Sequence, residues 1–203
     1  MFRQSIQIIA AVATVAALAA CGEDPAAQNQ TPALTLTVDG TVETLANVVF
    51  SAKSSTAAVS LRFAGHVDPD PQLADEEYTF ALNIELERSA FEALTAPATL
   101  GLDGTAAVDA DRTTDTSTRT WTPGAGASAV VQLVYADHLC YCAGQDGQLS
   151  QTVTGALSLT RIEGTQRLAG HVTATVQGEF LDSSDTHTVS FDADFELDVT
   201  PQT

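Results

Sequence analysis

The chain has 203 residues and is strongly acidic, with 26 Asp and Glu residues against 8 Lys and Arg and a formal net charge of −18 at pH 7. Binding to the phosphates of DNA or RNA requires clustered Lys and Arg side chains, and the sequence contains no such cluster. The composition therefore argues against a nucleic-acid partner, and the length suits a single folded domain.

The first twenty residues have the pattern of a secretory signal. One charged residue, Arg3, precedes an uncharged and mostly apolar run over 5–20. A membrane-spanning helix needs about 20 apolar residues, whereas a shorter apolar run after a basic start is typical of a cleaved signal peptide. We therefore expect residues 1–20 to be a signal peptide.

The apolar run ends in the sequence "LAAC", from Leu18 to Cys21. This segment resembles the lipobox of bacterial lipoproteins, in which small residues precede a cysteine that receives acyl chains. The resemblance implies cleavage before Cys21 and a partnership with membrane lipid through the acylated Cys21. Because stable anchoring takes more than one acyl chain, a multiply acylated cysteine would hold the chain without a spanning helix. Gly22 follows the cysteine in place of Asp, which in such lipoproteins implies the cell envelope's outer membrane, on its periplasmic or surface face.

A polar segment follows the cysteine and leads into the rest of the chain. Residues 22–32, "GEDPAAQNQTP", contain two prolines and show no hydrophobic periodicity. Such a composition predicts a flexible tether, so we divide the chain into a signal peptide (1–20), a lipidated cysteine with its tether (21–32) and a single β domain (33–203).

From residue 34 onward, apolar and polar residues alternate. In "HTVSFDADFELDVT", Phe191 and Phe195 fall on one side, while Asp192 and Asp194 fall on the other. Side chains alternate across a strand, so the pattern predicts strands with one buried and one solvated face. The sequence predicts strands over 34–38, 42–50, 57–67, 77–87, 99–108, 129–136, 152–162, 167–180 and 187–200.

The connections between these strands indicate the fold class. Short turn signals, such as "VDGT" at 38–41, favour hairpins. One short helix is predicted over 89–94, where Ser89 and Glu92 have the spacing of a capping box. The expected fold is all-β: an antiparallel β-sandwich or a closed barrel-like sheet, with one short helix.

One cluster has residues suited to metal or redox chemistry. In "DHLCYC", His138, Cys140 and Cys142 are spaced by two, and an extended chain would place them on one face. Thiolates and an imidazole suit Zn²⁺ or Cu(I), whereas two thiols in an oxidising compartment favour a disulfide. We predict the Cys140–Cys142 disulfide, with free thiols and a metal site as alternatives. The Cα atoms of an extended pair would lie about 6.6 Å apart, so we also expect the chain to bend here.

No other motif indicates catalysis. The sequence lacks a GxSxG nucleophile elbow, an HExxH zinc motif and a glycine-rich phosphate loop. Trp121 could be a sugar-stacking platform, although a lone Trp is more often a core residue. The prediction is a membrane-anchored lipoprotein without cofactor, whose non-catalytic β domain binds a protein or glycan or supports the cell envelope. The alternative is an envelope protein that handles metal or redox chemistry through the cysteine cluster.

Overall fold

A computed structural model of the protein describes residues 33–67, 78–94, 97–111, 116–140, 147–161, 166–180 and 183–201. The predicted signal peptide, the lipidation site Cys21 and the tether lie outside these residues, as does Cys142. Within the described residues, no helix is long and apolar enough to cross a membrane.

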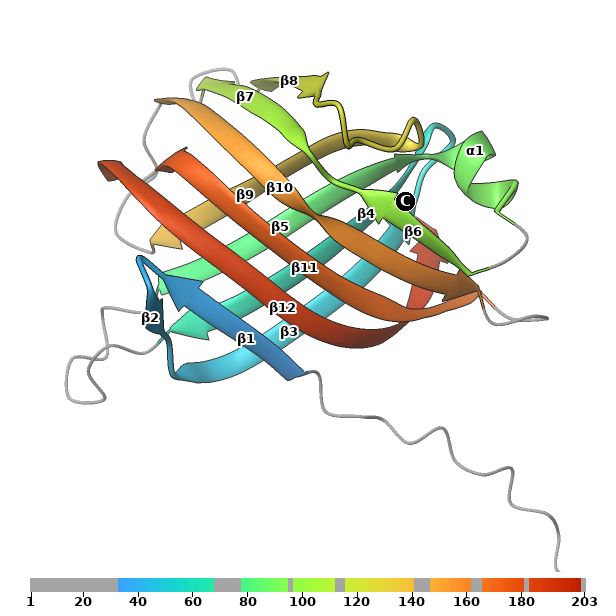
Figure 1. The fold of residues 1–203 in the computed structure, drawn as a ribbon, viewed down its shortest axis with the longest axis horizontal. Helices are drawn as coiled ribbons and strands as arrows, with labels where there is room; N and C mark the ends of the chain where they lie inside the picture. Colours follow the sequence, from blue (N-terminus) through green and yellow to red (C-terminus); the bar gives the residue numbers. More distant parts are fainter. Residues whose placement is uncertain are drawn as a thin grey trace, which may run out of the picture.

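The described chain is built almost wholly of β-strands (Figure 1). The elements are β1 (Ala33–Val38), β2 (Thr41–Val42), β3 (Leu45–Ser54), β4 (Ala58–Val67), β5 (Tyr78–Glu87), α1 (Arg88–Glu92), β6 (Ala98–Gly101), β7 (Gly104–Asp111), β8 (Thr116–Pro123), β9 (Val131–Cys140), β10 (Gly147–Arg161), β11 (Arg167–Phe180) and β12 (Ser183–Pro201). The all-β prediction with a short helix is confirmed.

These strands form one large sheet in the order β8-β7-β10-β11-β12-β3-β4-β5-β9, with β1, β2 and β6 attached beside this path. Nearly all pairings are antiparallel, but β12 and β3 run parallel where Val199 lies beside Ala52. The sheet is therefore mixed rather than wholly antiparallel. The expectation of a closed barrel-like sheet is wrong, because the end strands β8 and β9 are not hydrogen-bonded to each other.

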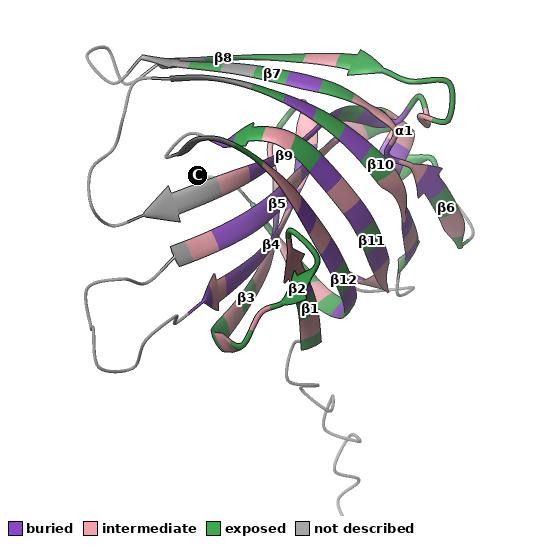
Figure 2. Cartoon of the chain, turned by 60° about the vertical axis from the view of Figure 1, so that its left-hand side comes forward, coloured by how far each residue is buried: buried purple, intermediate pink, exposed green. Residues whose placement is uncertain are grey.

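The alternating pattern of the sequence matches the burial of side chains. Along β12, Phe191 is 1% and Phe195 6% exposed, while Asp192 and Asp194 are exposed. Figure 2 shows the same alternation as bands along β10 and β11. Apolar side chains from β1, β3–β6 and β9–β12 meet in one main core. Burial of this apolar area from water, at about 25 cal/mol per Å², is the main stabilising contribution.

The β1–β2 turn lies where "VDGT" predicts it. Asp39 and Gly40 both have positive φ angles, 49° and 85°, as a tight hairpin turn requires. The Asp39 carboxylate accepts a hydrogen bond from the Thr188 backbone N–H (2.8 Å) and contacts His187 Nδ1 at 2.7 Å. These contacts lower the pKa of Asp39 and connect the turn to β12.

The short helix is capped differently from the prediction. It begins at Arg88, and the Glu87 carboxylate accepts hydrogen bonds from the backbone N–H groups of Ser89 and Ala90. Ser89 therefore lies inside the helix, and its hydroxyl donates to Glu87 instead of capping the helix itself. Glu92 contacts Arg88 at 2.7 Å rather than completing a capping box.

Two predicted strands are divided in the structure, and one strand was not predicted. The run over 42–50 is split between β2 and β3, and the run over 99–108 is split between β6 and β7. Strand β8 has the sequence "TSTRTWTP", which lacks apolar alternation because most of its side chains face solvent. Its position is set by pairing with β7.

Candidate ligand-binding groove

The two ends of the sheet overlap, and this overlap creates the candidate site. Ala106 of β7 and Trp121 of β8 pack against Leu133 and Tyr135 of β9 as a second, smaller apolar cluster. Leu133 and Tyr135 point away from the main core, to which β9 contributes Val134 and Ala136. The β7–β8 end therefore lies against the outer face of β9. Trp121 is a packing residue of this cluster, as the core interpretation predicts.

A side-chain amide fixes the position of β9 beside β10. Gln151 is 0% exposed, and its side chain both accepts from the Ala136 N–H (2.9 Å) and donates to the Ala136 carbonyl (2.9 Å). It also donates to the Glu179 carbonyl of β11 (3.0 Å). Gln151 thus forms the pair of hydrogen bonds with the β9 backbone that a neighbouring strand would form. Opposite Gln151, Gly178 has φ +150°, and a Cβ there would lie 2.1 Å from the Ser150 carbonyl oxygen.

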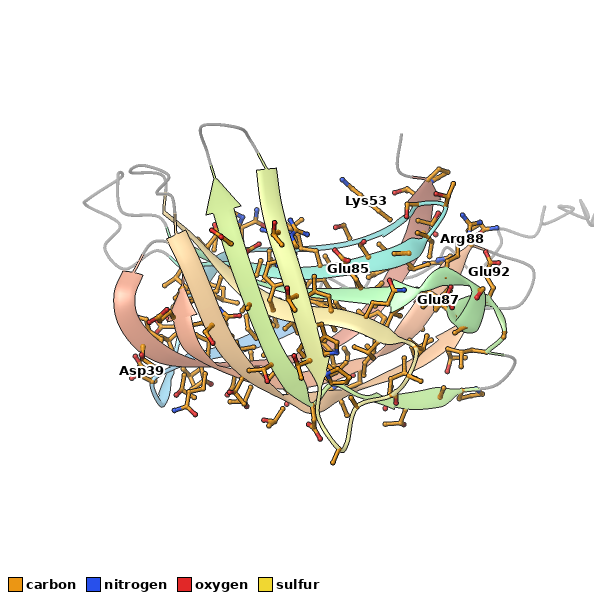
Figure 3. The ribbon with its side chains drawn as sticks, turned by 90° about the horizontal axis from the view of Figure 1, so that it is seen from above. Asp39, Lys53, Glu85, Glu87, Arg88 and Glu92 are labelled. Carbon is orange, nitrogen blue, oxygen red and sulfur yellow. The ribbon has the colours of Figure 1, made fainter. Side chains whose placement is uncertain are left out.

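Beside this overlap lies a groove of about 490 Å³ on the outer face of β3, β4, β5 and β9, bounded by β8. We call it the polar groove. Its charged and amide-bearing lining residues are Lys53, Arg62, Asn83, Glu85, Arg119 and Asp137. Three serines, Tyr135 and the apolar residues Ala58, Leu61 and Ile84 form the rest of the lining. Lys53 and Glu85 lie on this face (Figure 3). A second hollow near α1 has a volume of about 40 Å³, which suffices only for a few water molecules.

Strand register explains why these residues share one face. One row across the sheet pairs Arg62 with Asn83 and Asn83 with Tyr135. A parallel row pairs Lys53 with Ser60 and Ser60 with Glu85. Directly paired residues of adjacent strands point to the same side, so each row forms a continuous line of side chains. The alternate residues of the same strands, such as Leu61 and Ile84, are part of the main core.

Arg62, Asn83 and Asp137 form a hydrogen-bonded group in the groove wall. Arg62 Nη1 donates to Asn83 Oδ1 (2.8 Å) and lies 3.3 Å from Asp137 Oδ2. Asn83 Nδ2 donates to the same carboxylate oxygen (2.9 Å). The Asp137 side chain is 14% exposed, and its burial raises its pKa despite the opposing effect of the nearby Arg62 charge. Desolvation therefore outweighs the ion pair at this carboxyl.

Arg119 reaches across from β8 and covers part of the same wall. Its guanidinium lies 5.1 Å from the ring centroid of Tyr135, and Nη1 lies 3.3 Å from Glu85 Oε1. Burial, together with the negative charge of Asp137, raises the pKa of Tyr135 to about 12. The phenol consequently stays protonated at physiological pH. The groove thus offers hydrogen-bond donors and charged groups to a ligand.

The predicted cysteine cluster lies at the end of β9 and is only partly within the described chain. Strand β9 stays in register with β5 up to Cys140, which pairs with Tyr78. The bend that we expected therefore does not occur before Cys140. No group of three His, Cys, Asp or Glu residues placed to hold a metal occurs in the part of the chain that the structure describes. The disulfide and the metal site both stay predictions.

The polar groove could not be recognised in the sequence. Arg62 and Asn83 lie within predicted strands and Asp137 directly follows one, but nothing in their spacing indicates that β8 adds Arg119. The available signal was the distribution of positive charge, since Lys53 and Arg62 lie on successive strands of an acidic chain. Gln151 was missed because its polar side chain interrupts an apolar face.

The chain matches no family model, and neither a curated protein nor a solved structure is significantly similar to it.

Proposed function

We propose that the protein is a lipid-anchored, non-catalytic binding protein of the bacterial cell envelope, whose ligand binds in the polar groove. The observation that carries the binding role is the groove itself. It collects charged, amide and hydroxyl side chains from five strands on a single outer face. A few converging polar groups in a concave surface are typical of small-molecule sites.

The binding role can be tested by NMR titration. The ¹⁵N-labelled protein would be mixed with fractionated small molecules extracted from bacterial envelopes, and amide shifts would be mapped onto the sheet. We expect shifts concentrated on β3, β4, β5 and β8, and their loss in Ser60→Trp, which fills the groove. Thr173→Trp, at an exposed position of β11, is the matched control. Shifts that are absent, or equal in both variants, would contradict a binding role for the groove.

The membrane anchor rests on the lipobox resemblance at Cys21. In the proposal, acyl chains on Cys21 hold the β domain at the outer membrane, and residues 22–32 link the two. Cys21→Ser should release the protein from the membrane fraction or leave its signal uncleaved. Cys140→Ser is the control, because it removes a thiol outside the lipobox. A Cys21→Ser protein that stays membrane-bound and is processed at the same site would refute the anchor.

We also infer a sandwich-like arrangement, in which the β10–β12 part of the sheet packs face to face on the β4–β9 part. Phe80 of β5 and Phe180 of β11 support it, because their ring centroids are 6.0 Å apart although their strands are not neighbours in the sheet.

A further inference from the structure

The polar groove concentrates positive charge on an acidic protein. The chain has 26 acidic against 8 basic residues, yet the groove is lined by Lys53, Arg62 and Arg119 against Glu85 and Asp137. The groove thus has more positive than negative side chains, whereas the chain as a whole has more negative ones. Fields are strongest where like charges line a concave surface, so the groove attracts anions that the rest of the surface repels.

The two acids of the groove already have partners. Asp137 accepts from Arg62 and Asn83, and Glu85 contacts Arg119. Lys53 is exposed, and its ammonium makes no ion pair or hydrogen bond to any residue in the described ranges. No carboxylate of the described groove therefore neutralises the Lys53 ammonium, which can pair with an incoming anion.

Both guanidinium groups keep donors for a ligand. Within the described chain, Arg62 and Arg119 each bond to protein acceptors through Nη1 alone. The Nε and Nη2 groups of Arg62 are not buried, and the side chains of Arg62 and Arg119 are 34% and 41% exposed. The Nε–Nη2 edge of arginine is the geometry that binds two oxygens of a carboxylate or phosphate at once.

From these observations we infer that the polar groove binds a small polar molecule through a carboxylate or phosphate group, held by Lys53 and the open edges of Arg62 and Arg119. Serine hydroxyls lie beside these cations and would bind the uncharged polar part of the ligand. This inference rests on the proposed function, because it specifies the ligand of the same groove.

The test compares four ligands that share one sugar ring: glucuronate, glucose 6-phosphate, neutral glucose and cationic glucosamine. Each would be titrated into the whole purified protein by NMR and calorimetry at low and high salt. We expect glucuronate, glucose 6-phosphate or both to bind at least tenfold more tightly than glucose, and added salt to weaken the binding. Whichever of the two anions binds identifies carboxylate or phosphate as the preferred group.

Substitutions of the groove cations test whether the anion binds in the polar groove. Lys53→Met should weaken anion binding about three- to tenfold, and Lys53→Met combined with Arg119→Gln should abolish it. Arg167→Gln removes one positive charge outside the groove and should leave the affinity unchanged; melting curves show whether each variant is folded. Equal binding of glucose and the anions, or an affinity unaffected by Lys53→Met, would overturn the anion inference and leave the binding role intact. If none of the four sugars binds, the inference fails, while the envelope-extract titration judges the binding role separately.

Discussion

The contact between β9 and β10 should depend on the Gln151 amide. In Gln151→Leu, the N–H and C=O of the fully buried Ala136 lose their side-chain partner. Each buried group left unpaired costs about 1–3 kcal/mol, so the free energy of unfolding should fall by about 2–6 kcal/mol. The Glu179 carbonyl adds less, because Glu179 is an exposed residue and water can replace the lost donor.

Urea unfolding followed by tryptophan fluorescence is a suitable assay, because Trp121 lies in the apolar cluster between β7, β8 and β9. With a slope of about 2 kcal/mol per molar urea, the midpoint of Gln151→Leu should fall by about 1–3 M. Thr152→Val changes the adjacent exposed residue and should alter stability by less than about 0.5 kcal/mol. If the two variants had the same urea midpoint, Gln151 would not hold β9 against β10.

Three further results are expected. Phe195→Ala should cost about 3–5 kcal/mol in denaturant unfolding, whereas Asp194→Ala on the exposed face should cost less than about 0.5 kcal/mol; similar losses would reverse the assigned faces. The folded protein raises the pKa of Asp137, so protonation of this carboxyl stabilises the fold. This stabilisation is fully present below the pKa of 3.8 in the unfolded chain, and it is lost as pH rises through the pKa in the folded protein. Urea titrations of the wild type and Asp137→Asn would measure this effect. The free energy of unfolding of the wild type minus that of the variant should decrease as pH rises over this range. A constant or growing difference would contradict the effect of burial on the Asp137 pKa. Intact mass before and after reduction should show the gain of a hydrogen pair if Cys140 and Cys142 are bonded, and an unchanged mass with two alkylatable thiols would exclude the bond.

Much of the fold could be predicted because the period of two along each strand is a local property. Phe191 and Phe195 are buried in the strand face that alternation assigns to them, and the Asp39–Gly40 turn lies where its residues require. Whether the sheet closes could not be predicted in this way. Closure depends on how far the sheet curves over many strands, and no single strand segment contains that information.

The candidate site was unpredictable for the same reason. A polar side chain on a strand shows only that its face is not in the main core, and it does not show which distant strand comes to lie beside it. Arg119 is 34 residues from Glu85 in sequence and approaches it only because the β7–β8 end covers β9. Gln151, on a face that is otherwise apolar, is the local feature that could have indicated this contact.

A crystal structure of the protein with glucuronate or glucose 6-phosphate at saturating concentration would show whether the polar groove is the ligand site. We expect the carboxylate or phosphate within hydrogen-bond distance of at least two of Lys53, Arg62 and Arg119, with the sugar ring beside the serine hydroxyls of the groove. A ligand bound elsewhere on the protein, or a groove that stays empty while the titrated ligand is bound, would contradict this expectation.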